Sequence, residues 1–383
     1  MDSILIILLS IFMFLIIYNY IGYPVLVMLF ARIYPVSHAV DMAYKPGVSV
    51  IIAAYNEELV IVKKIENTLA LNYPESNLQI IVVSDGSTDR TNTLVEKYSS
   101  RGVISLHIPE RGGKSAALNR AIGYASGEIL VFSDANNDYS ADAISHLVSH
   151  FVDPTVGGVS GSKRIYNNQD RESSKGDGLY WKYESAIKLA ESRLGSITAA
   201  EGEIFAVRKS LYTPIPHGYI NDDAAITFTI VKSGHRILYD KNAEAYEQAS
   251  ISLIDDFYVK LRMATGGYQT LAHEAGFLFS NPTWFTFSFF SHKVLRWLSP
   301  HLLIIIFVLC IGLLDSLLIK IFLALQISFY AIAIYGWIYR NKRSIPGFIY
   351  ISMYFCSMNL AMFLGFFRFI TKSQSVNWRK AAR

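Results

Sequence analysis

The sequence predicts an α/β fold in which a mostly parallel β-sheet is combined with transmembrane and interfacial α-helices. Apolar runs rich in Val and Ile end in polar turns at residues 48–58, 80–89 and 131–136. Continuous apolar strands that alternate with amphipathic helices are typical of a parallel sheet covered on both faces. Long apolar stretches near both ends of the chain reach the length that crosses a bilayer.

The composition is that of a protein tied to a membrane. Hydrophobic residues make up 52% of the chain and charged residues only 17%, below the roughly 25% of soluble domains. The formal net charge is +4 and the basic residues are scattered, so nucleic-acid binding has no support. The two cysteines, Cys310 and Cys356, lie in apolar segments and indicate neither a disulfide framework nor a zinc site.

The first element is a long apolar segment from Ile4 to Ala31, longer than the roughly 20 residues that span a bilayer. The residues before it carry no positive charge and no cleavage site is obvious, so residues 1–40 are expected to hold a transmembrane helix rather than a signal peptide. Arg32 and Lys45 follow this segment. The positive-inside rule therefore places the next domain, residues 41–276, in the cytoplasm.

Carboxylates stand where two predicted strands end. Asp85 follows an apolar run and precedes Gly86, which permits a tight turn, and Asp134 ends the apolar run that includes residues 131–133. Ligands of open parallel sheets bind at the carboxyl ends of the strands. We therefore expect Asp85 and Asp134 to lie at one edge of the sheet.

Asn136 adds a second oxygen ligand close to Asp134. Residues i and i+2 of an extended segment point the same way, so the two side chains can share one hard cation, Mg²⁺ or Mn²⁺. The alternative is a plain turn, because Asp and Asn are common after strands.

Five segments, in order between about residues 46 and 267, resemble the family 2 inverting glycosyltransferases. The resemblance implies a GT-A type nucleotide-sugar-binding fold for the domain at residues 41–276. Together with the flanking apolar segments, it points to the membrane-bound branch that includes the cellulose, hyaluronan and poly-N-acetylglucosamine synthases. The matching segments are Val50–Glu57, Ser84–Asp89, Arg111–Asn119, Asp134–Asn136 and Asp222–Asp223.

The resemblance implies a donor site for a nucleotide sugar, usually one linked to uridine. Its nucleotide-binding residues would be Ala54, Tyr55, Glu57 and Asp85. A turn-capping role is the alternative for Asp85.

Lys114 follows two glycines and opens a helix rich in Ala. Backbone N–H groups at a helix start and a lysine charge both favour phosphate, although the spacing is not that of a P-loop. The resemblance places Lys114 near the diphosphate or the donor sugar, with a solvated turn lysine as the alternative. It also implies that Asp134 holds a metal bridging the diphosphate. Asn136 is neutral where the polymer synthases commonly have a second Asp.

Inversion at the sugar requires a base that removes the proton from the attacking hydroxyl. The resemblance assigns this role to Asp223, with Asp222 as its neighbour, and adjacent carboxylates raise the pKa of one of the pair. The alternative is a helix start decorated with acids. Arg262 is implied to face the diphosphate.

The chain departs from the polymer synthases at Val259 and Met263, where they carry Gln and Trp. Met offers a flexible apolar surface rather than an aromatic face for the acceptor sugar. Long-chain synthesis is therefore in doubt. Trp181 either contacts the acceptor instead or packs in the core.

The C-terminal part is expected to hold more membrane helices. Residues 277–300 are aromatic but broken by polar residues, which favours interfacial helices. Residues 301–370 are expected to hold a hairpin of two spans and one further span, and residues 371–383 form a basic tail. Three such spans would place the tail outside, whereas its basic residues favour the inside.

These observations favour a multi-pass enzyme of the cell membrane with a cytoplasmic catalytic domain. It would transfer a hexosyl or N-acetylhexosaminyl group from a UDP-sugar to a glycan or lipid-linked hydroxyl. The alternatives are a processive polysaccharide synthase that also translocates its product, and a catalytically silent nucleotide-binding membrane subunit. Membrane lipid is the other expected partner.

Overall fold

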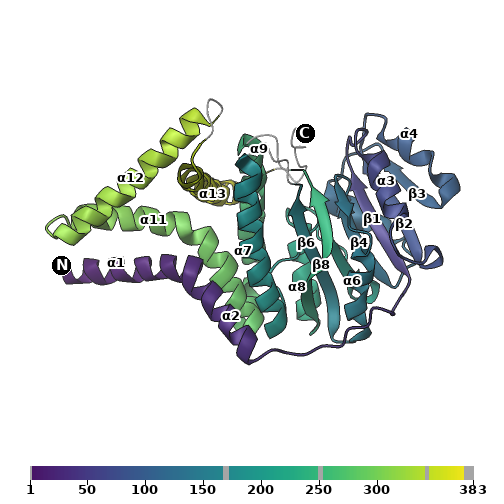
Figure 1. Cartoon of the computed structure of the whole chain (residues 1–383), viewed down its shortest axis with the longest axis horizontal. Coiled ribbons are helices and arrows are strands. Elements are labelled where there is room, and N and C mark those ends of the chain that lie inside the picture. Colours follow the sequence, from purple (N-terminus) through teal and green to yellow (C-terminus); the bar gives the residue numbers. More distant parts are fainter. Residues whose placement is uncertain (1, 167–171, 249–252, 341–344, 375–383) are drawn as a thin grey trace.

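The computed structural model describes residues 2–166, 172–248, 253–340 and 345–374. Most of the basic tail, from residue 375 on, lies outside this part of the chain. Figure 1 shows a sheet domain on one side and long helices on the other, with α7 (Glu172–Leu194) standing between them.

The sheet has eight strands in the order β3-β2-β1-β4-β7-β6-β8-β5. The first four are mutually parallel, β7 is antiparallel to β4 and β6, β6 is parallel to β8, and β5 is antiparallel to β8. This agrees with the mostly parallel sheet that the apolar runs predict. The strands are β1 (Val48–Ala54), β2 (Leu78–Asp85), β3 (Val103–Ile108), β4 (Ile129–Asp134), β5 (Asn137–Tyr139), β6 (Val156–Ile165), β7 (Phe205–Arg208) and β8 (Arg236–Glu247).

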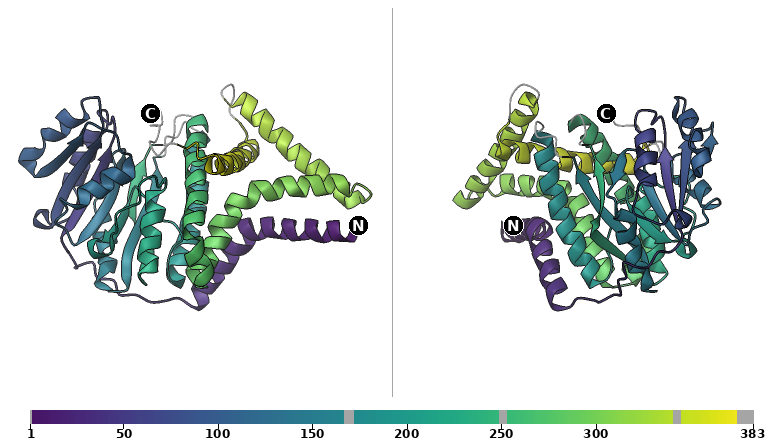
Figure 2. Two further views of the ribbon diagram at one scale, coloured as in Figure 1. Left: turned by 180° about the vertical axis from the view of Figure 1, so that it is seen from behind. Right: turned by 45° about the vertical axis from the view of Figure 1, so that its right-hand side comes forward.

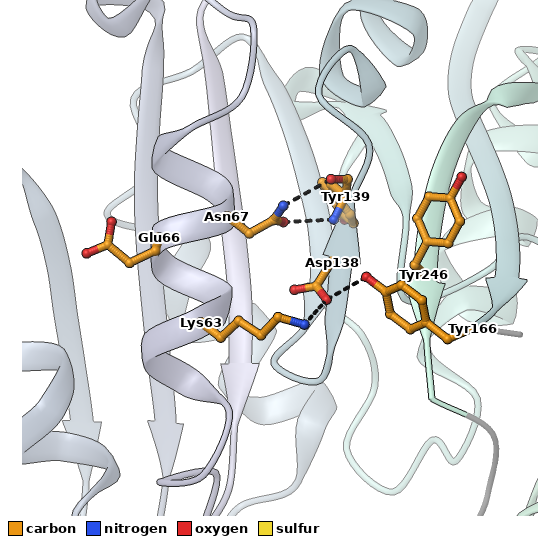
Figure 3. A pocket seen from close by; sticks show the side chains of 7 residues that line it. All are labelled: Lys63, Glu66, Asn67, Asp138, Tyr139, Tyr166 and Tyr246. Atoms are coloured by element: carbon orange, nitrogen blue, oxygen red, sulfur yellow. Dashed lines mark hydrogen bonds and ion pairs between the residues drawn. The ribbon is translucent and has the colours of Figure 1, made fainter. Parts of the chain in front are cut away.

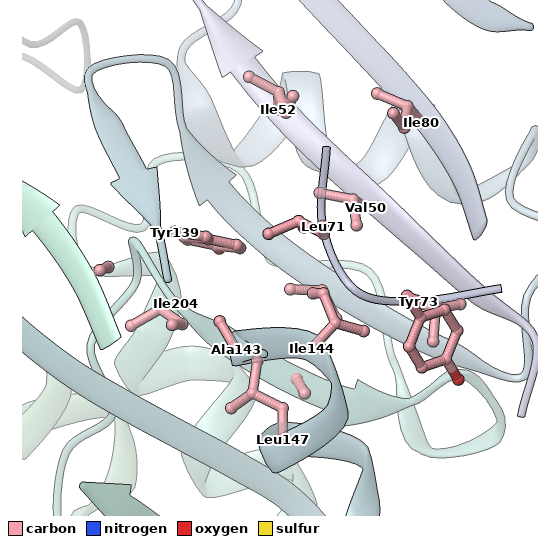
Figure 4. Packing of buried hydrophobic residues seen from close by; sticks show 14 of the residues in the cluster. Val50, Ile52, Leu71, Tyr73, Ile80, Tyr139, Ala143, Ile144, Leu147 and Ile204 are labelled. Carbon is pink, nitrogen blue, oxygen red and sulfur yellow. The ribbon is translucent and has the colours of Figure 1, made fainter. Parts of the chain in front are cut away.

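Helices cover both faces of the sheet because its central strands are apolar on both sides. All seven residues of β1 are buried, with alternate side chains in two core clusters. One cluster, drawn in part in Figure 4, packs under α3 (Ile61–Leu69), α4 (Thr91–Glu96) and α6 (Ala143–Ser149). The other packs under α5 (Lys114–Ile122) and α8 (Asp222–Lys232). Short 3₁₀ turns complete the domain: η2 (Glu75–Asn77), η3 (Ser99–Arg101), η4 (His150–Val152) and η5 (Lys209–Leu211).

Four helical stretches of the described chain are long and apolar enough to cross a membrane. In Figures 1 and 2 they lie on the side of α7 away from the parallel strands, and α1 runs beside α11. The stretches are α1 (Asp2–Ile17) with η1 (Tyr18–Gly22) and α2 (Tyr23–Ile33); α10 (Trp284–Ser288) with η6 (Phe289–Val294) and α11 (Leu295–Gly312); α12 (Leu317–Tyr339); and α13 (Gly347–Ile370). The long helix α9 (Leu253–Ser280) packs against α13.

Residues 277–300, expected to form interfacial helices, are helical except at residues 281–283. The first of these residues end α9, and residues 284–312 form one continuous helical stretch with Pro300 inside α11. Two of the polar residues in this region are buried: His292 is fully buried and Arg296 is 8% exposed.

A buried ionic cluster explains this burial and joins the sheet domain to the apolar helices. Glu184 and Glu191 of α7 are 3% and 1% exposed. His292 lies between them, with Nδ1 2.8 Å from Glu191 and Nε2 3.2 Å from Glu184. Arg296 pairs with Glu184, and the Tyr23 hydroxyl donates to Glu191 at 2.7 Å. Because buried carboxylates require charged or hydrogen-bonding partners, these contacts fix α7 against α2, η6 and α11.

The close approach of β1 and the segment before β4 gives a test of the core. A Cβ atom on Gly127 would lie 2.5 Å from the Ser49 backbone nitrogen and 2.6 Å from the Val48 carbonyl carbon. Gly127→Ala should therefore lower the free energy of unfolding by about 1–3 kcal/mol. Gly276→Ala is the control, because nothing lies within 4 Å of its added Cβ. Thermal unfolding of the detergent-solubilised protein measures both. Equal stability of Gly127→Ala and wild type would contradict this packing.

Candidate active site

The carboxyl ends of three neighbouring parallel strands bring the strand-end residues together. Ala54 ends β1, whose Ala53 is in register with Asp134 of β4, while Asp85 ends β2 on the other side. This is the arrangement that the strand pattern predicts. Asp85 and Asp134 thus flank β1 at one edge of the sheet.

The Asp85 carboxylate holds the glycine turn before α5 by two hydrogen bonds. Its Oδ1 accepts from the Gly112 N–H at 3.0 Å and its Oδ2 from the Gly113 N–H at 2.8 Å. Gly113 has φ +88°, a conformation that L side chains rarely adopt, so the turn requires glycine there. The carboxylate is completely buried and positions the start of α5.

The residues after β1 form the adjoining wall. Tyr55 has the Arg111 guanidinium 3.6 Å from its ring centroid, a cation–π contact that joins the β1 loop to the glycine turn. Glu57 is buried, and its N–H donates to the Thr91 hydroxyl at 2.8 Å. Arg111 was not assigned a role from the sequence, although it belongs to the Arg-Gly-Gly-Lys segment.

Lys114 bridges three elements. Its Nζ lies 2.8 Å from Asp134 Oδ1 and 3.5 Å from Asp222 Oδ2, so the start of α5, the end of β4 and the start of α8 meet at one ammonium group. Burial opposes the charge, but the two aspartates raise the pKa of Lys114 overall. The lysine therefore keeps its proton, and Lys114, Asp134 and Asp222 form one cluster.

Asp222 and Asp223 open α8, where negative charge is favourable. Asp223 Oδ1 accepts from the Ala224 N–H at 2.8 Å. Burial and the neighbouring Asp222 raise the pKa of Asp223 to about 6, while Lys114 opposes the shift. Asp222 and Asp223 thus lie in the first turn of α8 and also face Lys114 of the strand-end cluster.

Helix α9 packs against the residues that lead into α8. Asn221 Nδ2 donates to the Met263 carbonyl at 3.0 Å, and Ile220 N–H donates to Gln269 Oε1 at 2.9 Å. Arg262, next to Met263, is half-buried on this helix. Within the described residues it makes no ion pair with Asp222 or Asp223.

A second charged group lies beside this cluster and was not found from the sequence. A Cβ atom on Gly202 would lie 3.5 Å from both Lys114 Nζ and Asp223 Cβ, so the loop before β7 touches the site. The next residue, Glu203, pairs with Lys163 Nζ at 3.1 Å. Burial raises the pKa of Glu203 to about 7, against the effect of Lys163. The sequence signal that could have indicated Glu203 is the Glu201-Gly202-Glu203 segment, two glutamates around one glycine in an otherwise apolar stretch.

Asn136 turns toward β8 rather than toward Lys114. Its Nδ2 donates to Glu247 Oε1, and Glu247 also contacts Lys163. In the part of the chain that the structure describes, no group of three or more His, Cys, Asp or Glu side chains is arranged to hold a metal ion. A metal ion at this edge of the sheet would therefore need other oxygen donors in addition to carboxylates, such as an amide or a phosphate.

Trp181 of α7 lies at the junction of α7, β6 and α9. Its half-buried ring has Lys163 Nζ and Lys260 Nζ each 5.3 Å from the ring centroid. Of the two roles considered for Trp181, packing in the apolar core does not describe this position.

A pocket of about 500 Å³ lies away from this cluster, beside α3 and the edge strand β5. Figure 3 shows Lys63 and Tyr166 directed at Asp138, with distances to its Oδ2 of 2.5 and 2.8 Å. The pocket contains none of the predicted site residues. Asp138, which follows Asn136 closely in sequence, belongs to this pocket.

The mixed, mostly parallel sheet with a lysine and carboxylates at its strand ends is a GT-A type fold. Residues 49–213 match the model of glycosyl transferase family 2. The chain is 28% identical over 235 residues to a poly-β-1,6-N-acetyl-D-glucosamine synthase of Staphylococcus aureus, covering 60% of this chain and 56% of that protein. It is 29% identical over 235 residues to a β-monoglucosyldiacylglycerol synthase of Nostoc sp., covering 58% and 49%. The chain thus spans about half the length of these curated relatives.

A solved structure shares the fold over nearly the whole chain. The mannosyltransferase PcManGT from Pyrobaculum calidifontis, in complex with GDP-Man and Mn²⁺, matches with a TM-score of 0.75 and 23% identity. The match covers 96% of this chain and 100% of that one, so the apolar helices as well as the sheet domain share its fold.

The raised pKa of Glu203 predicts how its replacement changes stability with pH. The folded pKa of about 7 exceeds the roughly 4.3 of an exposed glutamate, so the stability due to the neutral form is complete below about 4.3 and lost as the pH rises through 7. Glu203→Gln should therefore raise the melting temperature by a few degrees at pH 8 and little at pH 5. The exposed Glu75→Gln serves as control. An equal shift at both pH values would contradict the assignment.

Proposed function

We propose that the chain is a membrane-anchored inverting glycosyltransferase. It transfers a hexosyl or N-acetylhexosaminyl group from a nucleotide-diphosphate sugar, UDP-linked in our proposal, to a glycan or lipid-linked hydroxyl. The observation that carries the proposal is the cluster of Lys114, Asp134, Asp222 and Asp223 at the carboxyl edge of the sheet. This cluster lies where open α/β sheets bind ligands.

The donor lies across the strand ends in this proposal. Ala54, Tyr55, Glu57 and Asp85 form the nucleotide side, and Asp85 acts there by shaping the glycine turn that it holds. Lys114 exchanges its carboxylate partners for the diphosphate, since a lysine at a helix start is suited to phosphate.

Asp223 is the base in this proposal. The acceptor oxygen forms a bond to the anomeric carbon, the bond from that carbon to the diphosphate oxygen breaks, and the acceptor proton passes to the Asp223 carboxylate. With a pKa of about 6, Asp223 is largely ionised at neutral pH and still basic enough to take a proton. The departing nucleotide diphosphate takes the electron pair of the broken bond. Lys114 binds the resulting negative charge, and we assign Arg262 to bind it as well.

Asp134 and Asn136 offer oxygen donors that fit a hard divalent cation, Mg²⁺ or Mn²⁺. When bound there, the cation would neutralise charge on the leaving nucleotide diphosphate. The mannosyltransferase of the same fold is in complex with Mn²⁺, which supports this assignment.

The acceptor is proposed to be a lipid-linked glycan that receives a single sugar. Two findings support this proposal: four helical stretches are long and apolar enough to cross a membrane, and the Nostoc relative is named for a diacylglycerol lipid. We propose that the enzyme lies in the cell membrane with its catalytic domain in the cytoplasm. A processive synthase is the second candidate, because the staphylococcal relative is named as a polymer synthase. Product length separates the two.

Nucleotide release tests the proposed reaction. The full chain in lipid, with Mn²⁺ or Mg²⁺ and a panel of UDP- and GDP-sugars, should release nucleotide from one donor. Asp223→Asn should lower the rate at least 100-fold while nucleotide binding stays unchanged, because only the base is lost. Binding without turnover of any donor, with acceptors present, would favour a silent subunit. Neither binding nor turnover would contradict the proposed function.

The pH dependence follows from the proposed role of Asp223. Its pKa of about 6 predicts that kcat/KM falls about tenfold for each pH unit below 6, because the protonated carboxyl cannot accept the acceptor proton. The profile between pH 5 and 8, with donor binding followed in parallel, measures this. A rate that stays flat down to pH 5 would exclude Asp223 as the base.

A further inference from the structure

The strand-end pair assigned to the metal is short of negative charge. Asp134 shares its carboxylate with Lys114 Nζ at 2.8 Å, and Asn136 is neutral. A hard divalent cation in a nucleotide site usually takes one or two carboxylates in addition to substrate phosphates. Even after Lys114 turns to the diphosphate, Asp134 is the single carboxylate of this pair, which leaves such a cation weakly held.

The pairing of β5 with β8 brings another carboxylate to this place. Asn137 at the start of β5 is in register with Glu247 at the end of β8. Asn136, one residue earlier, donates from Nδ2 to Glu247 Oε1. The side chain of Glu247 is 22% exposed, so its carboxylate is partly shielded from solvent.

We infer that Glu247 supplies the carboxylate that Asn136 lacks, so that Asp134, Asn136 and Glu247 together hold the divalent cation. This inference rests on the proposed function. A half-turn of the Asn136 side-chain amide exchanges the positions of its Nδ2 and Oδ1 atoms. After this rotation, Oδ1 lies on the side of Glu247. Asn136 Oδ1 and the Glu247 carboxylate then both present oxygen to one ion.

The surroundings of Glu247 allow this change. Lys163 Nζ is shared by Glu247 and Glu203, at 3.1 Å from Glu203 Oε1. When Glu247 turns to a cation, Lys163 keeps Glu203 as its partner, so no buried charge is left alone. Glu244, on the same strand, is instead bound to Arg164 Nε at 2.9 Å and accepts from the Tyr246 hydroxyl. It therefore provides a matched control.

Mn²⁺ binding tests the inference without any turnover. The full chain in lipid nanodiscs is titrated with Mn²⁺ in a fixed excess of UDP, and in parallel of GDP, and free Mn²⁺ is followed by electron paramagnetic resonance. Glu247→Gln should weaken Mn²⁺ binding at least tenfold, whereas Glu244→Gln should leave it unchanged. Adding Asn136→Asp to Glu247→Gln should restore most of the affinity, because it returns one carboxylate to the same place.

The rescue distinguishes a ligand from a structural partner of Lys163. Loss of affinity in Glu247→Gln that Asn136→Asp does not restore would overturn the inference, since the glutamate would then act through Lys163. Wild-type affinity in Glu247→Gln, with loss in Asp134→Asn, would overturn it and leave the proposed metal-dependent function intact. Failure of the wild type to bind Mn²⁺ with either nucleotide would overturn both the inference and the proposed metal.

Discussion

The ammonium group of Lys114 is the constraint on which the site depends. It joins the start of α5, the end of β4 and the start of α8 through Asp134 and Asp222. The position of α5 in turn depends on Asp85, whose carboxylate binds the glycine turn before it. Without a cation at this point, three buried or half-buried carboxylates would repel one another. The Lys114 ammonium group can also bind a diphosphate. The same side chain therefore serves both the fold and the proposed chemistry.

The sheet domain and the apolar helices form one unit through α7. Glu184 and Glu191 on this helix meet His292 and Arg296 of η6 and α11 in a buried ionic cluster. Between them, Lys188 reaches Glu201, which adjoins the Gly202 that touches Lys114 and Asp223. Helix α7 thus contacts both the apolar helices and the loop beside the candidate active site.

The sequence predicted those features that depend on local patterns. Apolar runs located β1, β2 and β4, and so placed Asp85 and Asp134 at one edge. It did not reveal Glu203 or Glu247, because their roles arise from pairings between distant strands: Asn136 and Glu247 are 111 residues apart. The sequence also did not reveal that His292 and Arg296 are buried, within the region expected to form interfacial helices at residues 277–300. These two residues find buried partners on α7, which hydropathy does not register.

A structure of the full chain in nanodiscs with UDP or GDP and Mn²⁺ tests the central claim most directly. The account predicts a nucleotide diphosphate at the carboxyl ends of β1, β2 and β4, with Lys114 Nζ turned from Asp134 to a phosphate oxygen. A nucleotide bound elsewhere, for example in the pocket beside α3, with the Lys114 ion pairs intact, would contradict it.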